Sequence, residues 1–177
     1  MKHSLIFVAI ALSLAACSDQ PSDKAAAQKA APAAVPTAPT YLKAEVARPA
    51  SLPAALAPAD SCVIDAINDQ LAQESNTLAD KSKVKFEGWA ANIVAGTTPQ
   101  EVYVELQGPT PAYLKANVGV KRPDVATAFN KPGVTDAGWI AFADLSALAA
   151  GSYKMRVIQV SAAAGLVCEI KPVIIIN

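Results

Sequence analysis

From residue 61 onward the sequence is a succession of short segments in which apolar and polar side chains alternate. In residues 83–89, Val84 and Phe86 face one way while the charged side chains face the other, as in a half-buried strand. Glycine and proline separate the segments and favour turns. About seven or eight such strands predict an all-β fold, an antiparallel β-sandwich. The predicted strands cover residues 62–67, 83–89, 100–107, 112–120, 139–142, 153–160 and 166–176.

One segment interrupts this rhythm and predicts a short helix or a 3₁₀ turn. Pro123 with Asp124 beside it is typical of a first helical turn, because proline needs no backbone partner there and the carboxylate favours the positive end of the helix dipole. Val125 and Phe129 are four residues apart and would share the face that packs on the sandwich. Residues 71–80 fit either an irregular loop or one or two helical turns.

The beginning of the chain has the pattern of an export signal. A positively charged start precedes an apolar run of about ten residues, which is too short to cross a bilayer as a helix. Small residues then lead to a cysteine in the order Leu14-Ala15-Ala16-Cys17. This pattern resembles the lipobox of bacterial lipoproteins, in which the signal, here residues 1–16, is removed and the cysteine carries a lipid. By the same resemblance, Ser18 in place of aspartate implies sorting to the outer membrane of the cell envelope.

Residues 17–60, which follow the signal, are rich in Ala, Pro, Ser, Thr and Lys and contain seven of the thirteen prolines. Proline removes backbone donors and alanine buries little surface, so this segment is predicted to be a disordered tether. One alternative is open, in which Tyr41, Leu42 and Lys43 dock on the domain. The predicted parts are therefore the signal (1–16), the lipidated Cys17 with its Ala/Pro-rich tether (17–60), and the β-sandwich (61–177).

The chain has three cysteines, Cys17, Cys62 and Cys168. Because Cys17 is assigned to the lipid, an even pair remains in an oxidising compartment, and we predict a disulfide between Cys62 and Cys168. This disulfide would close a loop spanning nearly the whole domain and would stabilise it by roughly 4–5 kcal/mol in the chain-entropy model. The alternative is a pair of buried free thiols.

Short motifs are spread along the domain: Ile64-Asp65-Ala66-Ile67-Asn68, Gly88-Trp89-Ala90, Arg122-Pro123-Asp124-Val125-Ala126, Gly138-Trp139, Asp144-Leu145-Ser146 and Gly151-Ser152-Tyr153. Together they resemble a bacterial immunoglobulin-like β-sandwich module of exported and envelope proteins, over about residues 62–175. The resemblance implies that Leu145 enters the core where the chain crosses between sheets. It also implies that Tyr153 buries its ring and bonds to nearby backbone through its hydroxyl. The resemblance supplies no activity and no catalytic residue.

The composition excludes several kinds of chemistry. The single histidine, His3, lies in the predicted signal, so the processed chain would lack Ser-His-Asp and Cys-His nucleophiles and ordinary histidine zinc sites. The formal net charge is zero, which argues against nucleic acid as a partner. The eight glycines are scattered and form no phosphate-binding loop. From these absences we expect no catalytic residue and no cofactor. We also expect no metal, since the acidic cluster from Asp65 to Asp69 lacks the calcium-loop pattern.

Five side chains are candidates for a binding surface: Trp89, Trp139, Tyr103, Tyr113 and Arg122. The two tryptophans could form an aromatic platform for sugar rings, although tryptophan after a strand glycine is more often core packing. The two tyrosines fall at outward-facing or rim positions and could contact a partner. Arg122 could hold a polar ligand together with Asp124. The interpretation we favour is that Arg122 pairs with a carboxylate such as Asp65 and fixes the crossover, while Asp124 caps the turn.

These features predict a membrane-anchored envelope lipoprotein whose β-sandwich is a non-catalytic binding or assembly module for an envelope protein or a glycan. Edge-strand addition is a natural mode of binding for such a fold. The alternative is a hydrolase of envelope polysaccharide, in which two carboxylates face one another across a concave pocket. Asp65 with Asp69, or Glu87 with Glu101 and Glu105, are the carboxylates that could converge.

Overall fold

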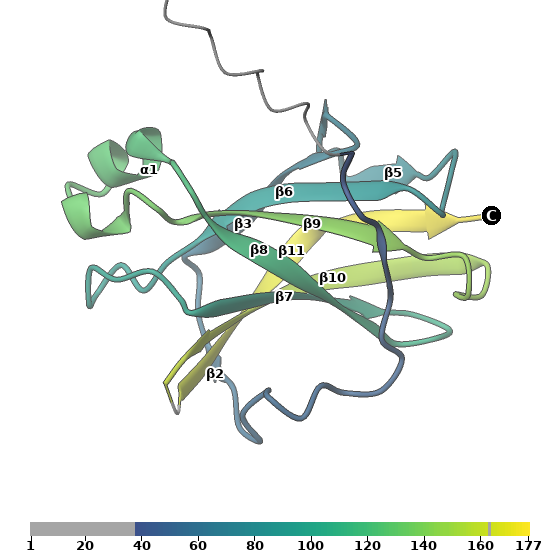
Figure 1. The fold of residues 1–177 in the computed structure, drawn as a ribbon, viewed down its shortest axis with the longest axis horizontal. Helices are drawn as coiled ribbons and strands as arrows, with labels where there is room; N and C mark the ends of the chain where they lie inside the picture. The colour runs from purple at the N-terminus through teal and green to yellow at the C-terminus, as the bar shows by residue number, and fades with distance from the viewer. Residues whose placement is uncertain (1–37, 163) are drawn as a thin grey trace, which may run out of the picture. The chain divides into compact units, whose positions relative to one another are not determined.

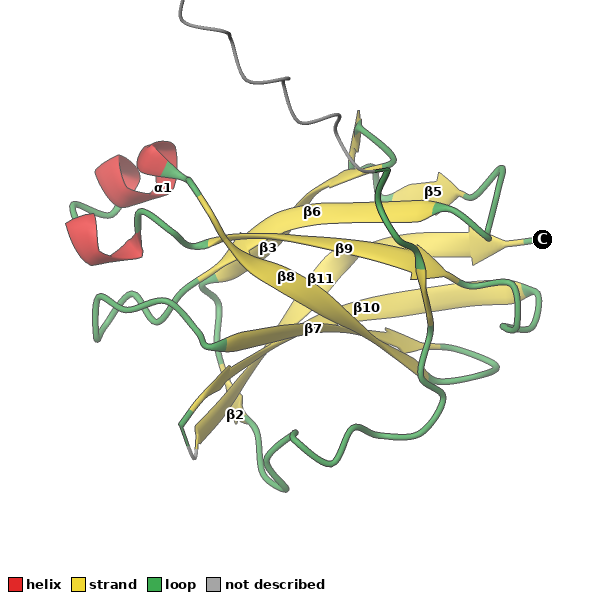
Figure 2. Cartoon of the chain, in the orientation of Figure 1, coloured by secondary structure: helices red, strands yellow, loops and turns green. Residues whose placement is uncertain are grey.

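The computed structural model describes residues 38–162 and 164–177. They form an all-β fold with one short α-helix, which confirms the predicted fold class (Figures 1 and 2). The predicted signal, Cys17 and residues 18–37 of the predicted tether lie outside the described residues. Within the described parts of the chain, no helix is long and apolar enough to span a membrane.

Seven long strands build a sandwich of two sheets that share one strand. Sheet A contains β3 (Cys62–Ile67), β6 (Val84–Ala90) and β9 (Gly138–Asp144), with the two-residue β4 (Gln70–Leu71) at its edge. Sheet B contains β7 (Glu101–Gln107), β10 (Gly151–Ser161) and β11 (Ala164–Ile176). The shared strand, β8 (Ala112–Val120), pairs with β7 in its first half and with β9 in its second half.

The order of these strands is that of an immunoglobulin-like sandwich. Counted along the chain, the first, second and fifth long strands lie in sheet A, and the third, sixth and seventh lie in sheet B. The fourth strand, β8, passes from one sheet to the other between Ala116, which pairs with β7, and Asn117, which pairs with β9. Gly119 lies beyond this point, where the pairing with β9 shifts register between Val118 and Val120, and its φ of +91° is a conformation that residues with a Cβ rarely adopt.

The core lies between the two sheets, where inward side chains of both interdigitate. Phe86 and Trp139 from sheet A meet Val104, Leu106 and Tyr153 from sheet B in one buried cluster. On the side away from β8, Cys62 of β3 and Cys168 of β11 form the predicted disulfide, with Cα atoms 6.2 Å apart. The sheets are therefore joined by a shared strand on one side and by a covalent bond on the other.

The prediction of a disordered tether up to residue 60 is wrong for residues 38–60. We call residues 41–61 the strap. Its strand β1 (Leu42–Lys43) pairs in parallel with the last residues of β9, and its strand β2 (Ala57–Pro58) pairs in parallel with β11. Between these strands Leu52 is buried against the outer face of sheet B. The segment as a whole has few apolar side chains, so its composition did not indicate that a few of them anchor its second half. The alternative that Tyr41, Leu42 and Lys43 dock on the domain is confirmed.

Proline suits the strap because much of it lies extended over a surface and donates few ladder hydrogen bonds. Pro58 lies in β2 at the edge of sheet B, which is where a strand tolerates proline. The Arg48 guanidinium donates to the carbonyls of Leu52 (2.9 Å) and Pro53 (2.6 Å), which otherwise lack strand partners. The same prolines that indicated disorder are therefore compatible with an ordered, extended path.

The remaining local predictions have mixed outcomes. The short helix is present as α1 (Pro123–Ala128), followed by a 3₁₀ turn, η1 (Pro132–Val134). Residues 71–80 are neither irregular throughout nor helical, since β5 (Ser75–Thr77) pairs in parallel with β11 and carries the chain from the edge of sheet A to the edge of sheet B. Leu145 and Tyr153 are fully buried, and the Tyr153 hydroxyl donates to the Ala149 carbonyl at 2.8 Å, as the resemblance implied.

Candidate functional site

Three connections lie at one end of the sandwich, which we call the loop end. They are residues 91–100 between β6 and β7, residues 121–137 with α1 and η1 between β8 and β9, and the tight turn between β10 and β11 (left side of Figure 1). The backbone N–H of Ala162 donates to the Gln100 side-chain oxygen at 2.9 Å, which ties the first connection to the third. Gly133 packs directly on the carbonyl of Gly96, where a Cβ would clash, and this contact ties the first connection to the second.

The first connection is a tight loop whose shape is held by hydrogen bonds to Asn92, one of its own residues. The Asn92 side-chain oxygen accepts the backbone N–H of Ala95 at 2.9 Å, and the Asn92 carbonyl accepts the backbone N–H of Gly96 at 2.8 Å. Gly96 has a φ of +69°, which closes the turn at little cost. The result is a projecting loop whose Val94 side chain is 95% exposed.

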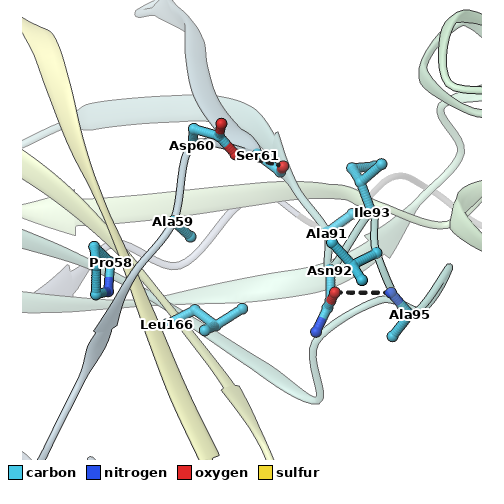
Figure 3. Close-up of a pocket in the computed structure, with 10 residues that line it drawn as sticks. Pro58, Ala59, Asp60, Ser61, Ala91, Asn92, Ile93, Ala95 and Leu166 are labelled. Carbon is cyan, nitrogen blue, oxygen red and sulfur yellow. Dashed lines mark hydrogen bonds between the residues drawn. The ribbon is translucent and has the colours of Figure 1, made fainter.

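A pocket of about 360 Å³ lies beside this loop (Figure 3). One wall is the end of the strap, with Asp60 and Ser61, and the facing wall is the loop from Ala91 to Ala95, while Leu166 of β11 lies between them. The lining is mostly apolar, and the polar groups are at Asp60, Ser61 and Asn92. The pocket therefore has the chemistry to accept an apolar side chain with a polar or cationic group beside it.

Trp89 supports the second connection rather than offering an open aromatic platform. Its side chain is 9% exposed and packs with Val125 of α1 and Val134 of η1 in a small separate cluster. Its ring centroid lies 5.5 Å from that of Phe129, which is itself 40% exposed. Trp89 thus fixes the position of α1 against sheet A, and Phe129 is the aromatic side chain that this packing leaves at the surface.

Arg122 binds two carboxylates at the start of the same connection. Its guanidinium lies 2.6 Å from Asp65 and 2.7 Å from Asp124. The hydrogen bonds from Arg122 lower the pKa of Asp124 to about 2, and those bonds raise the pKa of Arg122. The favoured interpretation, that Arg122 pairs with Asp65, is confirmed. Asp124 is not the N-cap residue of α1 but lies in its first turn, and its carboxylate is held mainly by Arg122.

Three of the five predicted surface residues are buried, and Trp89 is one of them. Trp139 is 1% exposed in the main core, so it is not part of a binding surface. Tyr103 faces outward from sheet B, as the alternation predicted, but it is 3% exposed because Leu52 of the strap covers it. The Tyr103 hydroxyl forms a 2.8 Å hydrogen bond with the hydroxyl of Ser51, which is a strap residue. An outward position in a strand therefore does not guarantee an exposed side chain.

The candidates other than Trp139 and Tyr103 are divided between the two sheets. The Arg122 side chain lies over Gly138, whose strand neighbour is Trp89, so Arg122 and Trp89 are brought together at the loop end. Tyr113 lies on sheet B and is half-buried. Its hydroxyl donates to Glu105 at 3.3 Å, and burial together with the charge of Glu105 raises the pKa of Tyr113. The five candidates therefore do not form one surface.

The carboxylates that could have formed a hydrolytic pair each form a salt bridge with a lysine or arginine side chain. Arg156 binds Glu105 at 2.6 Å, and Lys115 binds Glu101. Lys85 binds both Glu87 (2.9 Å) and Asp69 (2.7 Å), and these bonds raise the pKa of Lys85. Among the described residues, no group of three or more acidic, cysteine or histidine side chains is placed to hold a metal ion. Nothing in this arrangement favours the hydrolase alternative.

Sequence reasoning missed the pocket and the exposed Val94. Two local signals were present, the apolar pair Ile93-Val94 within a segment otherwise rich in turn residues, and the glycine at position 96. The pocket itself could not be found from any single segment, because its walls come from the strap, from the connection after β6 and from β11. Its formation depends on the docking of a strap that the composition predicted to be disordered.

Comparison with known proteins adds little to this description. No protein-family model matches the chain, and no curated protein matches it. Among solved structures, the chain is similar to the Listeria monocytogenes internalin-like protein lmo2027, with 13% sequence identity and a TM-score of 0.33. The match covers 58% of this chain and 27% of that one, so the chain spans about a quarter of that protein's length. A similarity this distant indicates no function.

Proposed function

We propose that this chain is a lipid-anchored lipoprotein of the cell envelope and that its β-sandwich is a non-catalytic module that binds an envelope protein or a glycan through the loop end. The observation that carries the proposal is the association of an apolar pocket with the exposed side chains of Val94 and Phe129, on connections that hold one another in place. Such preorganised loops on a rigid sandwich are a common site of recognition, because little conformational freedom is lost on binding.

The path of the strap supports this choice of surface. Residue 38 leads into β1, which pairs with Ala143 and Asp144 at the end of β9. The other end of β9, at Gly138, adjoins α1 and the loop end. The strap therefore joins the sandwich beside the end of β9 that is farther from the loop end. This polarity suits a module that reaches from a membrane towards a partner.

The residues of the loop end favour a protein partner over a sugar ring. A sugar-binding platform needs an exposed flat aromatic face, and both Trp139 and Tyr103 are buried. Phe129, which directly follows α1, is 40% exposed, and Val94 is an exposed aliphatic side chain on the first connection. Exposed apolar side chains around a small pocket are typical of the central part of a protein interface.

Affinity capture of the full-length protein from its native membrane tests the proposal. We expect the wild-type protein to retain a defined envelope protein, or to bind isolated cell-wall glycan, and we expect Phe129→Asp to abolish this retention. Leu71→Asp is the matched control, because Leu71 is 77% exposed on β4, at the end of β3 opposite the loop end. The proposal fails if neither protein nor glycan is retained, or if both variants lose the partner equally.

The lipid anchor is tested separately from the binding surface. We expect the full-length chain to incorporate a labelled fatty acid, to sediment with outer-membrane vesicles and to resist extraction with salt. Cys17→Ala should abolish the label and release the chain, whereas Cys62→Ala should leave the label in place. Labelling that persists in Cys17→Ala would disprove lipidation at this residue.

A further inference from the structure

We propose that the loop end also contains a self-complementary contact, through which two copies of this chain associate about a two-fold axis. Val94 projects from the loop at 95% exposure and lines the pocket from the adjacent wall. The molecule therefore carries an apolar projection and an apolar recess side by side on one surface. This inference goes beyond the proposed function, since it concerns a second copy and not an envelope partner.

A two-fold axis pairs each feature on one side of the axis with a feature at the same distance on the other side. With the axis between the pocket and the tip of the loop, Val94 of each copy enters the pocket of the other. The pocket has about 360 Å³, with Ala59, Ala91 and Leu166 among its apolar lining. Both valines would thus be removed from water in one symmetric contact. The hydrophobic free energy gained in this way would stabilise the dimer.

The charges flanking these two features fit the same axis. Asp60 is exposed on the strap wall of the pocket, whereas the Lys131 side chain packs beside Gly96 of the loop and does not line the pocket. Neither Asp60 nor Lys131 forms an ion pair within the described residues 38–162 and 164–177. In the order Asp60, pocket, Val94, Lys131, the two-fold axis places Asp60 of one copy opposite Lys131 of the other.

Photo-crosslinking in intact cells tests this contact in the full-length chain. A photoreactive side chain at position 94 should yield a crosslinked homodimer, with the linkage mapped to residues 58–61 or 166 of the second copy. The same group at position 71, also exposed but at the opposite end of β3, should yield none. Crosslinks from position 94 only to other proteins would overturn the self-association and would instead support the proposed function.

Charge reversal separates a second copy from any other partner. Asp60→Lys alone and Lys131→Asp alone should each lower the yield of homodimer about threefold, because each places like charges opposite one another. The two substitutions together restore the opposite charges across the axis and should restore the yield. Val94→Ser should lower the yield about tenfold. The Cys62–Cys168 disulfide, assayed on a non-reducing gel, reports whether each variant is folded. Failure of the double variant to recover while its disulfide forms would overturn the proposal.

Discussion

On sheet A the outward side chains of β6 include Lys85 and Glu87, which form ion pairs, and Trp89, which α1 covers. On sheet B the outward side chains include Tyr103 and Ile158, which the strap covers. Ion-paired side chains satisfy their own polar groups and can remain in water. Apolar side chains on an outer face are unfavourable in water, so a segment that covers them stabilises the fold. The strap is therefore ordered by the face below it as much as by its own sequence, with Leu52 as its buried anchor.

A trace of this difference is present in the sequence of β10. A strand with one face in water alternates, but residues 157–160 of β10, Val-Ile-Gln-Val, are buried on both faces. Val157 belongs to the core between the sheets, and Ile158 and Val160 belong to the cluster under the strap. A break in alternation within an antiparallel strand thus indicates that a further segment lies on its outer face.

The largest effect is expected from breaking the bond that joins the two sheets. Replacing Cys62 and Cys168 together by alanine should lower the free energy of unfolding by roughly 4–5 kcal/mol, because the unfolded chain is no longer closed into a loop across a sequence separation of 106 residues. Urea unfolding of the double variant against the oxidised wild type measures this difference. A loss below about 1 kcal/mol would show that the shared strand β8 alone holds the sheets together.

The next effect concerns the cover on sheet B. Leu52→Ala should cost about 2–3 kcal/mol, since Leu52 is 5% exposed over Tyr103, Ile158 and Val160. It should also make residues 48–56 susceptible to limited proteolysis. Val46→Ala is the control within the same strap, because Val46 is 58% exposed and should change stability by less than about 0.5 kcal/mol. Equal effects of the two substitutions would contradict the assignment of Leu52 as the anchor.

A smaller effect is expected where the chain crosses from sheet A to sheet B. Tyr153→Phe keeps the fully buried ring but removes the hydroxyl that donates to the Ala149 carbonyl, and it should cost about 1 kcal/mol in thermal or urea unfolding. Tyr41→Phe is the matched control, since the Tyr41 ring packs on Phe142 and its hydroxyl has no hydrogen-bond partner among the described residues. A neutral Tyr153→Phe would mean that this hydrogen bond contributes nothing beyond what water supplies to the unfolded chain.

The sequence predicted best what depends on neighbouring residues. The apolar run at residues 62–67 and the alternation at residues 112–120 predicted β3 and β8 with their observed bounds, and cysteine counting predicted the disulfide. It failed where a side chain's environment is set by a distant segment. Tyr103 was placed on the correct face but is covered by the strap, and the pocket beside Val94 needs three segments that are far apart in the chain. Low apolar content did not exclude order, because one leucine over an apolar face suffices to hold an extended strap.

The smallest effect on stability, and the most local one, concerns the ion pairs on the sheet A side. The pKa of Asp124 is lowered to about 2, first by its hydrogen bonds from Arg122. Because this pKa is below the ordinary value of 3.8, the stabilisation it represents is present above about pH 4 and is lost as the pH falls through about 2. Arg122→Met should return the pKa of Asp124 towards 3.8, as followed by the NMR shift of its carboxyl carbon during titration.

Asp144 is the internal control for this titration. Its pKa is also lowered, but by hydrogen bonds from Ser146, and Arg122 has no part in that. We expect Arg122→Met to leave the titration of Asp144 unchanged while that of Asp124 moves. If Asp124 keeps its low pKa without the guanidinium, its position in the first turn of α1 must be the cause. The pKa of this outer side chain of sheet A would then be set by the nearby backbone and by packing rather than by a paired charge. In this respect sheet A would resemble sheet B, whose outer side chains are held by packing under the strap.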